Sequence, residues 1–265
     1  MEVFTCEDSF EGMMTCVYEA WASRAGHSNV RLMLEPVEEL ELFCSYHHVE
    51  RDSEKARKVV SSIRRKISEQ AFRMVYGASL SCQREKLDAI YRFLILGFHV
   101  GAEAVDLLGN EWVNRVFQLD RKVKNEAHYF REFTRFSSVE GREILWAKIQ
   151  PKSEILTLLA PNFSDRMPSE AWIIVDEGRM TAAVHPPDEE FYLTKITGEE
   201  LNAMERSYEV SDPYVGLWKS FFHAIGIEQR RNPKCQRTMM PLWYRRNMTE
   251  FREENSGGVR AKGNG

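Results

Sequence analysis

The part of the chain with the most distinctive chemistry is residues 228–246. It contains six basic residues and a single acid, Glu228, with asparagine, glutamine, tryptophan and tyrosine between them. Guanidinium groups donate paired hydrogen bonds to phosphate oxygens, and aromatic rings stack on nucleobases. This mixture is typical of a nucleic-acid surface. The alternative is structural, with the arginines pairing to acids such as Glu228 and Glu250 and closing the fold.

Seven residues are expected to contact nucleic acid if the first interpretation holds. The arginines and the lysine would hold phosphate groups, Asn232 would hydrogen-bond to a base or to the backbone, and Tyr244 would stack on a base. The seven candidates are Arg135, Arg230, Arg231, Asn232, Lys234, Arg237 and Tyr244.

A second basic segment lies earlier in the chain, at residues 51–66. Seven basic residues stand here against two acids, and four of the cations lie opposite an apolar helical stripe. Those four are Arg57, Lys58, Arg64 and Arg65. The segment is either a solvated helix face or a face that contacts phosphates. The sequence leaves open whether the two basic segments meet in space.

Three residues are candidates for acid–base chemistry: Glu126, His128 and Asp176. Glu126 and His128 fall near the expected end of a helix, where the helix dipole favours a charged imidazole. With Asp176 they would have to converge on one cleft to act as general acid and base. No phosphate-binding loop, nucleophile elbow or zinc-protease motif occurs in the sequence. No cofactor is therefore expected, and no reaction is indicated.

The cysteines and histidines do not form a ligand set for a metal ion. Cys44, His47 and His48 have Cys-x-x-His spacing, but no second ligand pair accompanies them. The five cysteines are odd in number and widely spaced, so a disulfide framework is not expected either. Reduced thiols are typical of a cytoplasmic protein.

Composition and charge exclude several classes of protein. Hydrophobic residues make up 43% and charged residues 29% of 265 residues, which is typical of a packed, soluble chain. The net charge is −4, so any nucleic-acid surface has to be a local patch. No apolar run approaches the ~20 residues needed to span a bilayer, and no membrane partner is expected.

The spacing of apolar residues predicts an α+β fold. Short strands at residues 2–6 and 30–34 flank a first helix, and helices follow over 53–76, 84–108 and 112–130. A period of two then predicts a central antiparallel sheet of about five strands with one helix crossing it, before a helical C-terminus. We expect three regions: a mainly helical one (1–130), the sheet with the C-terminal helices (131–252), and a disordered tail (253–265).

Several motifs occur in an order that resembles a known family. They include residues 9–12 and 18–21 near the start, Trp-Ala-Lys-Ile-Gln-Pro at 146–151, and Leu-Trp-Lys-Ser-Phe-Phe at 217–222, followed by Arg-Asn-Pro at 231–233. The chain resembles bacterial "probable DNA metabolism proteins", built around a domain of unknown function. Such domains are fused to uracil-DNA glycosylase domains or encoded beside a radical-SAM protein of DNA repair or modification. The resemblance implies a role in DNA metabolism, with such an enzyme as a partner in trans.

Three functions remain open from the sequence. The first, which we expect, is an accessory protein that binds DNA and presents it to a repair enzyme. The second is an enzyme acting on a nucleobase or nucleotide. The third is a protein-docking module without nucleic-acid contact, which would present an exposed apolar surface.

Overall fold

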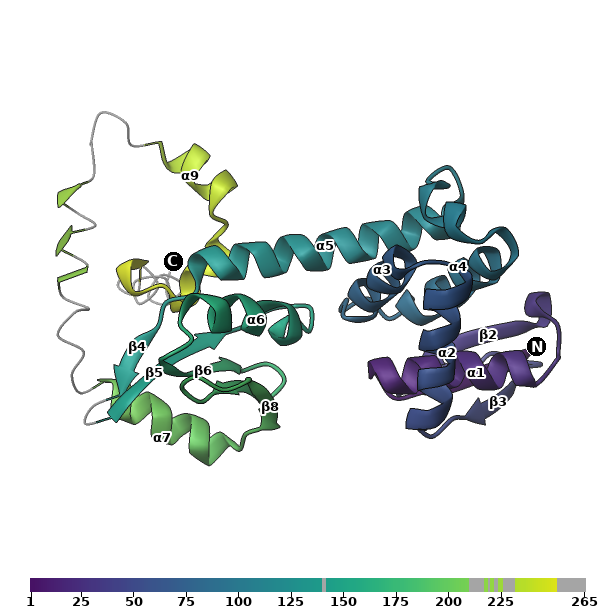
Figure 1. The fold of residues 1–265 in the computed structure, drawn as a ribbon, viewed down its shortest axis with the longest axis horizontal. Helices are drawn as coiled ribbons and strands as arrows, with labels where there is room; N and C mark the ends of the chain where they lie inside the picture. Colours follow the sequence, from purple (N-terminus) through teal and green to yellow (C-terminus); the bar gives the residue numbers. More distant parts are fainter. Residues whose placement is uncertain (140–141, 210–216, 219, 222–223, 226–231, 252–265) are drawn as a thin grey trace, which may run out of the picture. The chain divides into compact units, whose positions relative to one another are not determined.

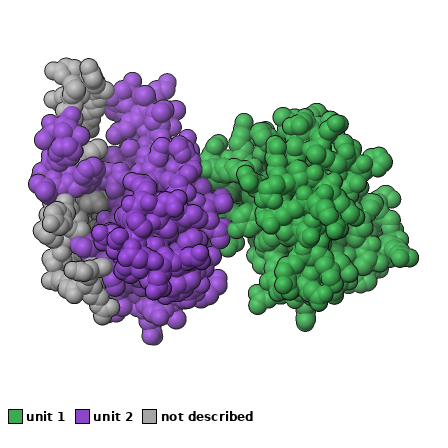
Figure 2. All heavy atoms as spheres, viewed as in Figure 1, with its two compact units in different colours: residues 1–125, 152–154 green, residues 126–151, 155–265 purple. Residues whose placement is uncertain are grey.

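The computed structural model describes residues 1–139, 142–209, 217–218, 220–221, 224–225 and 232–251 (Figure 1). These residues belong to two compact units (Figure 2). Unit 1 comprises residues 1–125 and 152–154, and unit 2 comprises residues 126–151 and 155–265. The predicted tail at 253–265 lies outside the described residues. Over the described ranges, no helix has the length and apolar character needed to cross a membrane.

Unit 1 opens with a small parallel sheet in the order β2-β1-β3. The central strand β1 (Glu2–Cys6) is buried, and α1 (Phe10–Ala22) connects it to β2 (Val30–Leu34) after the short helix η1 (His27–Asn29). The predicted first two strands are thus present. The third strand, β3 (Ser45–His48), was not predicted, because it is short and largely exposed and so carries no alternating apolar pattern.

Four further helices complete unit 1: α2 (Ser53–Lys66), α3 (Glu69–Ser79), α4 (Lys86–Val100) and the first part of α5 (Glu111–Phe133). The prediction of one helix from 53 to 76 is wrong, because Ser68 begins a new helix by accepting the N–H of Ala71 on its Oγ at 3.0 Å. The next predicted helix ends early, at Gly101, whose φ of 83° favours glycine. A short 3-10 helix, η2 (Ala102–Asp106), follows.

Apolar residues from all these elements form one core in unit 1. Its largest fully buried side chains are Met13 and Met14 of α1, Leu32 of β2, Ile63 of α2, Leu87, Ile90, Tyr91, Phe93 and Leu94 of α4, and Leu119 of α5. Their periodic spacing along each helix is the stripe on which the sequence prediction rested. The core therefore holds α1 and α4 against the parallel sheet, and α2 packs on α1.

Unit 2 contains a five-stranded sheet in the order β4-β5-β6-β7-β8. The strands are β4 (Ser137–Val139), β5 (Arg142–Ile149), β6 (Ala171–Asp176), β7 (Thr181–His185) and β8 (Tyr192–Lys195). The α+β class and the strand number agree with the prediction. The expected purely antiparallel arrangement is corrected at one place, since β5 and β6 pair in parallel. Their connection contains α6 (Leu156–Arg166), and such a helical crossover permits parallel pairing.

Helices cover both faces of this sheet (Figure 1). On one face Trp172 packs against Phe163 of α6, with ring centroids 6.3 Å apart. On the other face Val175 shares a cluster with Leu201 of α7 (Gly198–Glu209). α6 continues through Pro161 to Arg166. The remaining described elements are α9 (Pro233–Met239), η4 (Leu242–Asn247) and η5 (Thr249–Phe251).

Candidate nucleic-acid interface

The described part of the C-terminal basic segment lies in unit 2, on α9 and η4. α9 begins at Asn232, whose Oδ1 accepts the N–H of Cys235 at 3.0 Å, with Pro233 at the first helical position. The Asn232 oxygen is therefore engaged in capping this helix. All of α9 is exposed, so Lys234 and Arg237 project into solvent. The candidates Arg230 and Arg231 lie outside the described residues.

Trp243 and Arg246 form a stacked pair in η4, the 3-10 helix that follows α9 in the sequence. The Arg246 guanidinium lies 4.4 Å from the centroid of the Trp243 ring. Both side chains are tied to Gln150, the residue that follows β5. Trp243 Nε1 donates to the Gln150 carbonyl at 2.9 Å, and Arg246 Nη1 donates to Gln150 Oε1 at 3.2 Å. Because Trp243 is still 36% exposed, this arrangement holds an aromatic ring and a cation at the surface.

Tyr244, the next residue, is oriented toward the fold. Its ring packs among Tyr129, Phe130 and Phe133 of α5, with centroid separations of 5.1, 5.1 and 5.9 Å. Burial raises the pKa of Tyr244 to about 12, and the nearby Glu126 and Tyr129 add to the shift. The sequence named Tyr244 as the residue that stacks on a base, and in the structure its ring is packed within an aromatic cluster.

Arg135 is engaged by a buried carboxylate. Its Nη2 lies 3.0 Å from Glu250 Oε1, and its Nη1 donates to the Glu132 carbonyl at 2.9 Å. Glu250 also accepts a hydrogen bond from Trp218 Nε1 at 3.2 Å. The Glu250 side chain is only 2% exposed, so Arg135 compensates a charge inside the fold.

These contacts bear on the alternative interpretation of the basic segment. Glu250 pairs with Arg135 and not with an arginine of the segment, and Glu228 lies outside the described residues. No acid occurs between residues 232 and 247. Lys234, Arg237 and Arg246 form no ion pair with any residue that the structure describes, while Arg245 is buried against Phe251. The segment therefore presents three uncompensated cations and one exposed aromatic ring, and one of the cations, Arg246, lies on that ring.

The acid–base candidates do not form a comparable group. Glu126 is buried in α5, whereas His128 is exposed and its Nε2 lies 3.2 Å from Glu132 Oε1. Asp176 is fully buried at the end of β6 and is held by Arg179, whose Nη1 lies 3.0 Å from Oδ2. Burial raises the pKa of Asp176 above its ordinary value, although the Arg179 charge opposes the shift. The ion pairs of His128 and Asp176 thus involve separate partners.

The histidine cluster belongs to unit 1. His47 Nε2 lies 2.5 Å from Glu2, and His48 Nδ1 lies 2.7 Å from Glu35. Thr5 Oγ1 donates to the same Glu35 oxygen at 2.7 Å. Over the described ranges, no three histidine, cysteine, aspartate or glutamate side chains are grouped so that they could hold a metal ion.

Three residues of this C-terminal group were not among the contacts expected from the sequence: Gln150, Trp243 and Arg246. A spacing of three residues between Trp243 and Arg246 was a usable signal, because residues i and i+3 align on a 3-10 helix. Gln150 carried no such signal, since its contact with Trp243 spans 93 residues of sequence.

The comparisons with known proteins give a family and no activity. No curated protein matches the chain significantly. Residues 84–250, more than half of the chain, match the domain of unknown function DUF4130. The motif resemblance is therefore confirmed only as far as this domain, whose description names no role in DNA metabolism. The matched residues include all of the described surface around Trp243 and Arg246. This chain belongs to the DUF4130 family.

Proposed function

We propose that this protein is an accessory factor of DNA metabolism that binds DNA through the C-terminal surface of unit 2. This surface, called here the Trp243 surface, consists of Gln150, Lys234, Arg237, Trp243 and Arg246. The observation that carries the proposal is that one short segment presents the Trp243–Arg246 stack together with two exposed cations, Lys234 and Arg237, that have no described ion-pair partner. The motif resemblance supports DNA as the nucleic acid.

The chemistry of the Trp243 surface fits a flexible single strand. An exposed indole can stack on any base, contributing about 1–3 kcal/mol, and flanking cations can contact successive phosphates. Arg246 lies over the indole, which is a cation–π arrangement that keeps the ring in place without covering both of its faces. Binding of this kind depends little on base sequence, because every base offers a flat face.

The test is fluorescence anisotropy with labelled single- and double-stranded DNA at several salt concentrations. If Lys234, Arg237 and Arg246 each contact a phosphate, the logarithm of the binding constant falls with the logarithm of salt with a slope on the order of −2. The variant Lys234→Gln with Arg237→Gln should bind more weakly and show a flatter slope. These residues are exposed, so the fold of the variant should be intact.

A matched control removes two cations elsewhere in unit 2. Lys195→Gln with Arg206→Gln changes the net charge by the same amount, and both residues are exposed and far in sequence from the Trp243 surface. This control should bind DNA like the unmodified protein. If both double variants bind DNA more weakly by the same amount, the loss of affinity comes from the change in net charge, and the proposed surface is contradicted.

We also propose that the protein acts together with a repair or modification enzyme in trans, either a radical-SAM protein or a uracil-DNA glycosylase. The supporting observation is an exposed apolar loop in unit 1, where Leu40, Leu42 and Phe43 are 73%, 85% and 96% exposed. Exposed apolar side chains in a group mark interaction surfaces. Co-elution of each purified enzyme with the protein, and its loss in Leu42→Ser with Phe43→Ser, tests this. Co-elution unaffected by the substitutions would remove the loop from the proposal.

A further inference from the structure

A groove of about 730 Å³ lies between α1 and α2 of unit 1, and none of the residues that line it belongs to the Trp243 surface. Phe10 and Glu11 of α1 line one side, and α2 supplies the other. The α2 residues that line it include Ser53, Arg57, Val60, Ser61, Arg64 and Arg65. Their spacing places most of them on one face of the helix, because residues three and four apart are neighbours.

The groove is lined by three arginines of α2, and two of these have no described ion-pair partner, whereas Lys55 and Lys58 outside the groove are both neutralised. Lys55 lies 2.7 Å from Glu19, and Lys58 lies 2.8 Å from Glu54. In contrast, the Arg65 guanidinium makes no hydrogen bond or ion pair with any described residue. Arg57 uses only its Nε, which donates to the Ser53 carbonyl at 3.2 Å. Arg57 and Arg65 are therefore available to an anionic ligand at the groove.

The third arginine of the groove is fixed in position beside an aromatic cluster. The Arg64 guanidinium lies 3.9 Å from the Phe72 ring centroid, and its Nε lies 3.1 Å from Glu69. Phe72 and Tyr76 of α3 contact Phe10 edge to face, with centroids 6.2 and 5.1 Å away. Phe10 is only partly buried and lines the groove, so part of its ring faces the open space.

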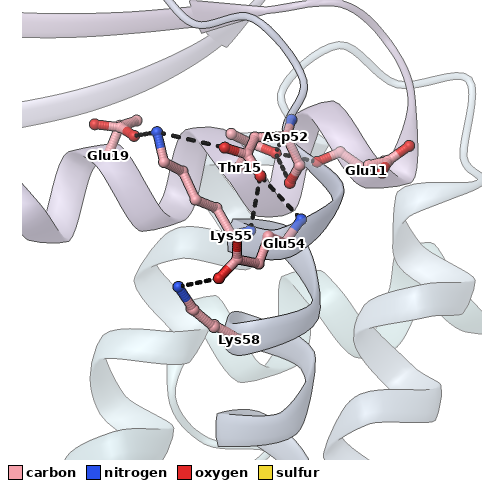
Figure 3. Close-up of polar contacts among 7 residues, drawn as sticks. All are labelled: Glu11, Thr15, Glu19, Asp52, Glu54, Lys55 and Lys58. Carbon is pink, nitrogen blue, oxygen red and sulfur yellow. Dashed lines mark hydrogen bonds and ion pairs between the residues drawn. The ribbon is translucent and has the colours of Figure 1, made fainter.

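The two helices that form the groove are clamped together (Figure 3). Asp52 caps α2 by accepting the N–H groups of Glu54 and Lys55 at 2.9 and 3.0 Å. Thr15 of α1 accepts the Asp52 N–H at 3.0 Å and donates to the Asp52 carbonyl at 3.2 Å. The hydrogen bonds to Glu54 and Lys55 also lower the pKa of Asp52, so the cap is charged at neutral pH. The groove is therefore preorganised, which reduces the entropy lost when a ligand binds.

We infer that this groove binds a nucleoside 5′-monophosphate, either as a free nucleotide or as the 5′-phosphorylated end of a single strand. Arg57 and Arg65 hold the phosphate, since guanidinium forks match phosphate oxygens. Phe10 and Val60 provide the flat apolar floor for the base. Glu11, the one acid among the lining residues, limits the negative charge that the groove accepts. The site lies outside the matched domain and does not depend on the proposed function.

Isothermal titration calorimetry of the full chain with dTMP, thymidine and inorganic phosphate tests the site. We expect dTMP to bind at least tenfold more tightly than thymidine, because thymidine lacks the phosphate. It should also bind more tightly than inorganic phosphate, which lacks the base. Arg57→Gln with Arg65→Gln should weaken dTMP binding at least tenfold. Arg121→Gln with Lys122→Gln removes two exposed cations of α5 that do not line the groove, and it should leave the affinity unchanged.

Methyl NMR gives a readout specific to the groove. Saturating dTMP should shift the Val60 methyl signals and leave those of the buried Val113 in place. Similar affinities for dTMP and thymidine, or dTMP binding that survives in the groove variant, would overturn the assignment. So would the absence of any dTMP binding by the folded chain.

Competition separates the two sources of the ligand. A 5′-phosphorylated oligonucleotide that displaces dTMP, when its 5′-hydroxyl counterpart does not, identifies a strand end. Failure of both to compete identifies a free nucleotide. Equal competition by the 5′-hydroxyl oligonucleotide would contradict the inference that the groove recognises a terminal phosphate. The groove variant retains every residue of the Trp243 surface. Loss of dTMP binding in this variant therefore tests the groove, whereas the anisotropy measurements on Lys234→Gln with Arg237→Gln test the proposed DNA-binding function.

Discussion

The guanidinium of Arg135 lies 3.0 Å from the carboxylate of Glu250, across 115 residues of sequence. Glu250 is almost fully buried, whereas the Arg135 side chain is 26% exposed. A buried carboxylate that loses its partner is far less stable than the intact pair. The relationship assigns to Arg135 a role in holding the C-terminal residues against the strand region, which its basic character alone did not indicate.

Arg135→Met should therefore act on stability. We expect a loss of about 3 kcal/mol in the free energy of unfolding, near the lower end for a broken buried pair because Trp218 still donates to Glu250. Chemical denaturation measures the loss. Adding Glu250→Gln should recover part of it, since the uncompensated charge is then absent. A loss below about 1 kcal/mol would contradict the role assigned to the pair.

Trp243 and Tyr244 should separate binding from folding. Trp243→Ala should weaken single-stranded DNA binding by about 1–3 kcal/mol, the typical contribution of one stacked base. Tyr244→Leu should lower stability by about 2 kcal/mol, because it removes part of a ring packed among three others. Folded Tyr244→Leu should bind DNA normally. Normal binding by Trp243→Ala, together with weak binding by Tyr244→Leu, would reverse the two roles.

This neighbouring pair shows where sequence reasoning stops. Both rings lie in the same basic segment, and composition offers no way to choose which one faces solvent. The choice depends on contacts distant in sequence, with Gln150 for Trp243 and with Phe130 for Tyr244. The basic character of the surface was predictable, because it depends on residue types alone. Its aromatic member was not.

The fold, like the surface, contains features that were predictable from the sequence and features that were not. The stripes of α2 and α4 were predictable from local spacing, because each depends on one helix. The break at Ser68 was missed since apolar spacing continues through it, and only the serine cap marks the new helix. The parallel pairing of β5 and β6 depends on how a chain segment with its own helix crosses the sheet, and local alternation contains no information on that.

His48 and Glu35 should titrate as a linked pair. The hydrogen bond from His48 lowers the pKa of Glu35, and the same bond raises the pKa of His48. The Glu35 contribution to stability is present above its unfolded pKa and is lost as pH falls through its lower folded value. The His48 contribution is complete below its unfolded pKa and is lost as pH rises through its higher folded value. The pair should therefore stabilise most between about pH 4.3 and about pH 6.5.

NMR titration of the histidine ring signals checks this pair. In the unmodified protein the pKa of His48 should lie above that of an ordinary histidine. In Glu35→Gln its pKa should fall back toward the ordinary value, because the charged acceptor is gone. An unchanged His48 pKa in Glu35→Gln would show that the carboxylate does not cause the shift.

Gly77 of α3 and Asp120 of α5 provide a test of packing inside unit 1. A Cβ atom on Gly77 would overlap Asp120 Oδ1, which is buried and makes no hydrogen bond to a described residue. Burial raises the pKa of Asp120, while the other carboxylate oxygen lies 2.7 Å from Lys124. Gly77→Ala should therefore lower the free energy of unfolding by about 1–3 kcal/mol, as overpacking does.

The sign of this effect should invert once the carboxylate is removed. In an Asp120→Ala background nothing within 3 Å would obstruct the new methyl group, since the other close atoms all belong to Asp120. Gly77→Ala should then stabilise by up to about 1 kcal/mol, the ordinary gain in helix propensity. Gly198→Ala serves as the control, because no atom lies within 4 Å of its added Cβ, and it should not destabilise. Thermal and urea unfolding of the four variants measures the coupling. A cost for Gly77→Ala that persists without Asp120 would mean that the glycine is required by the helix backbone and not by the carboxylate beside it.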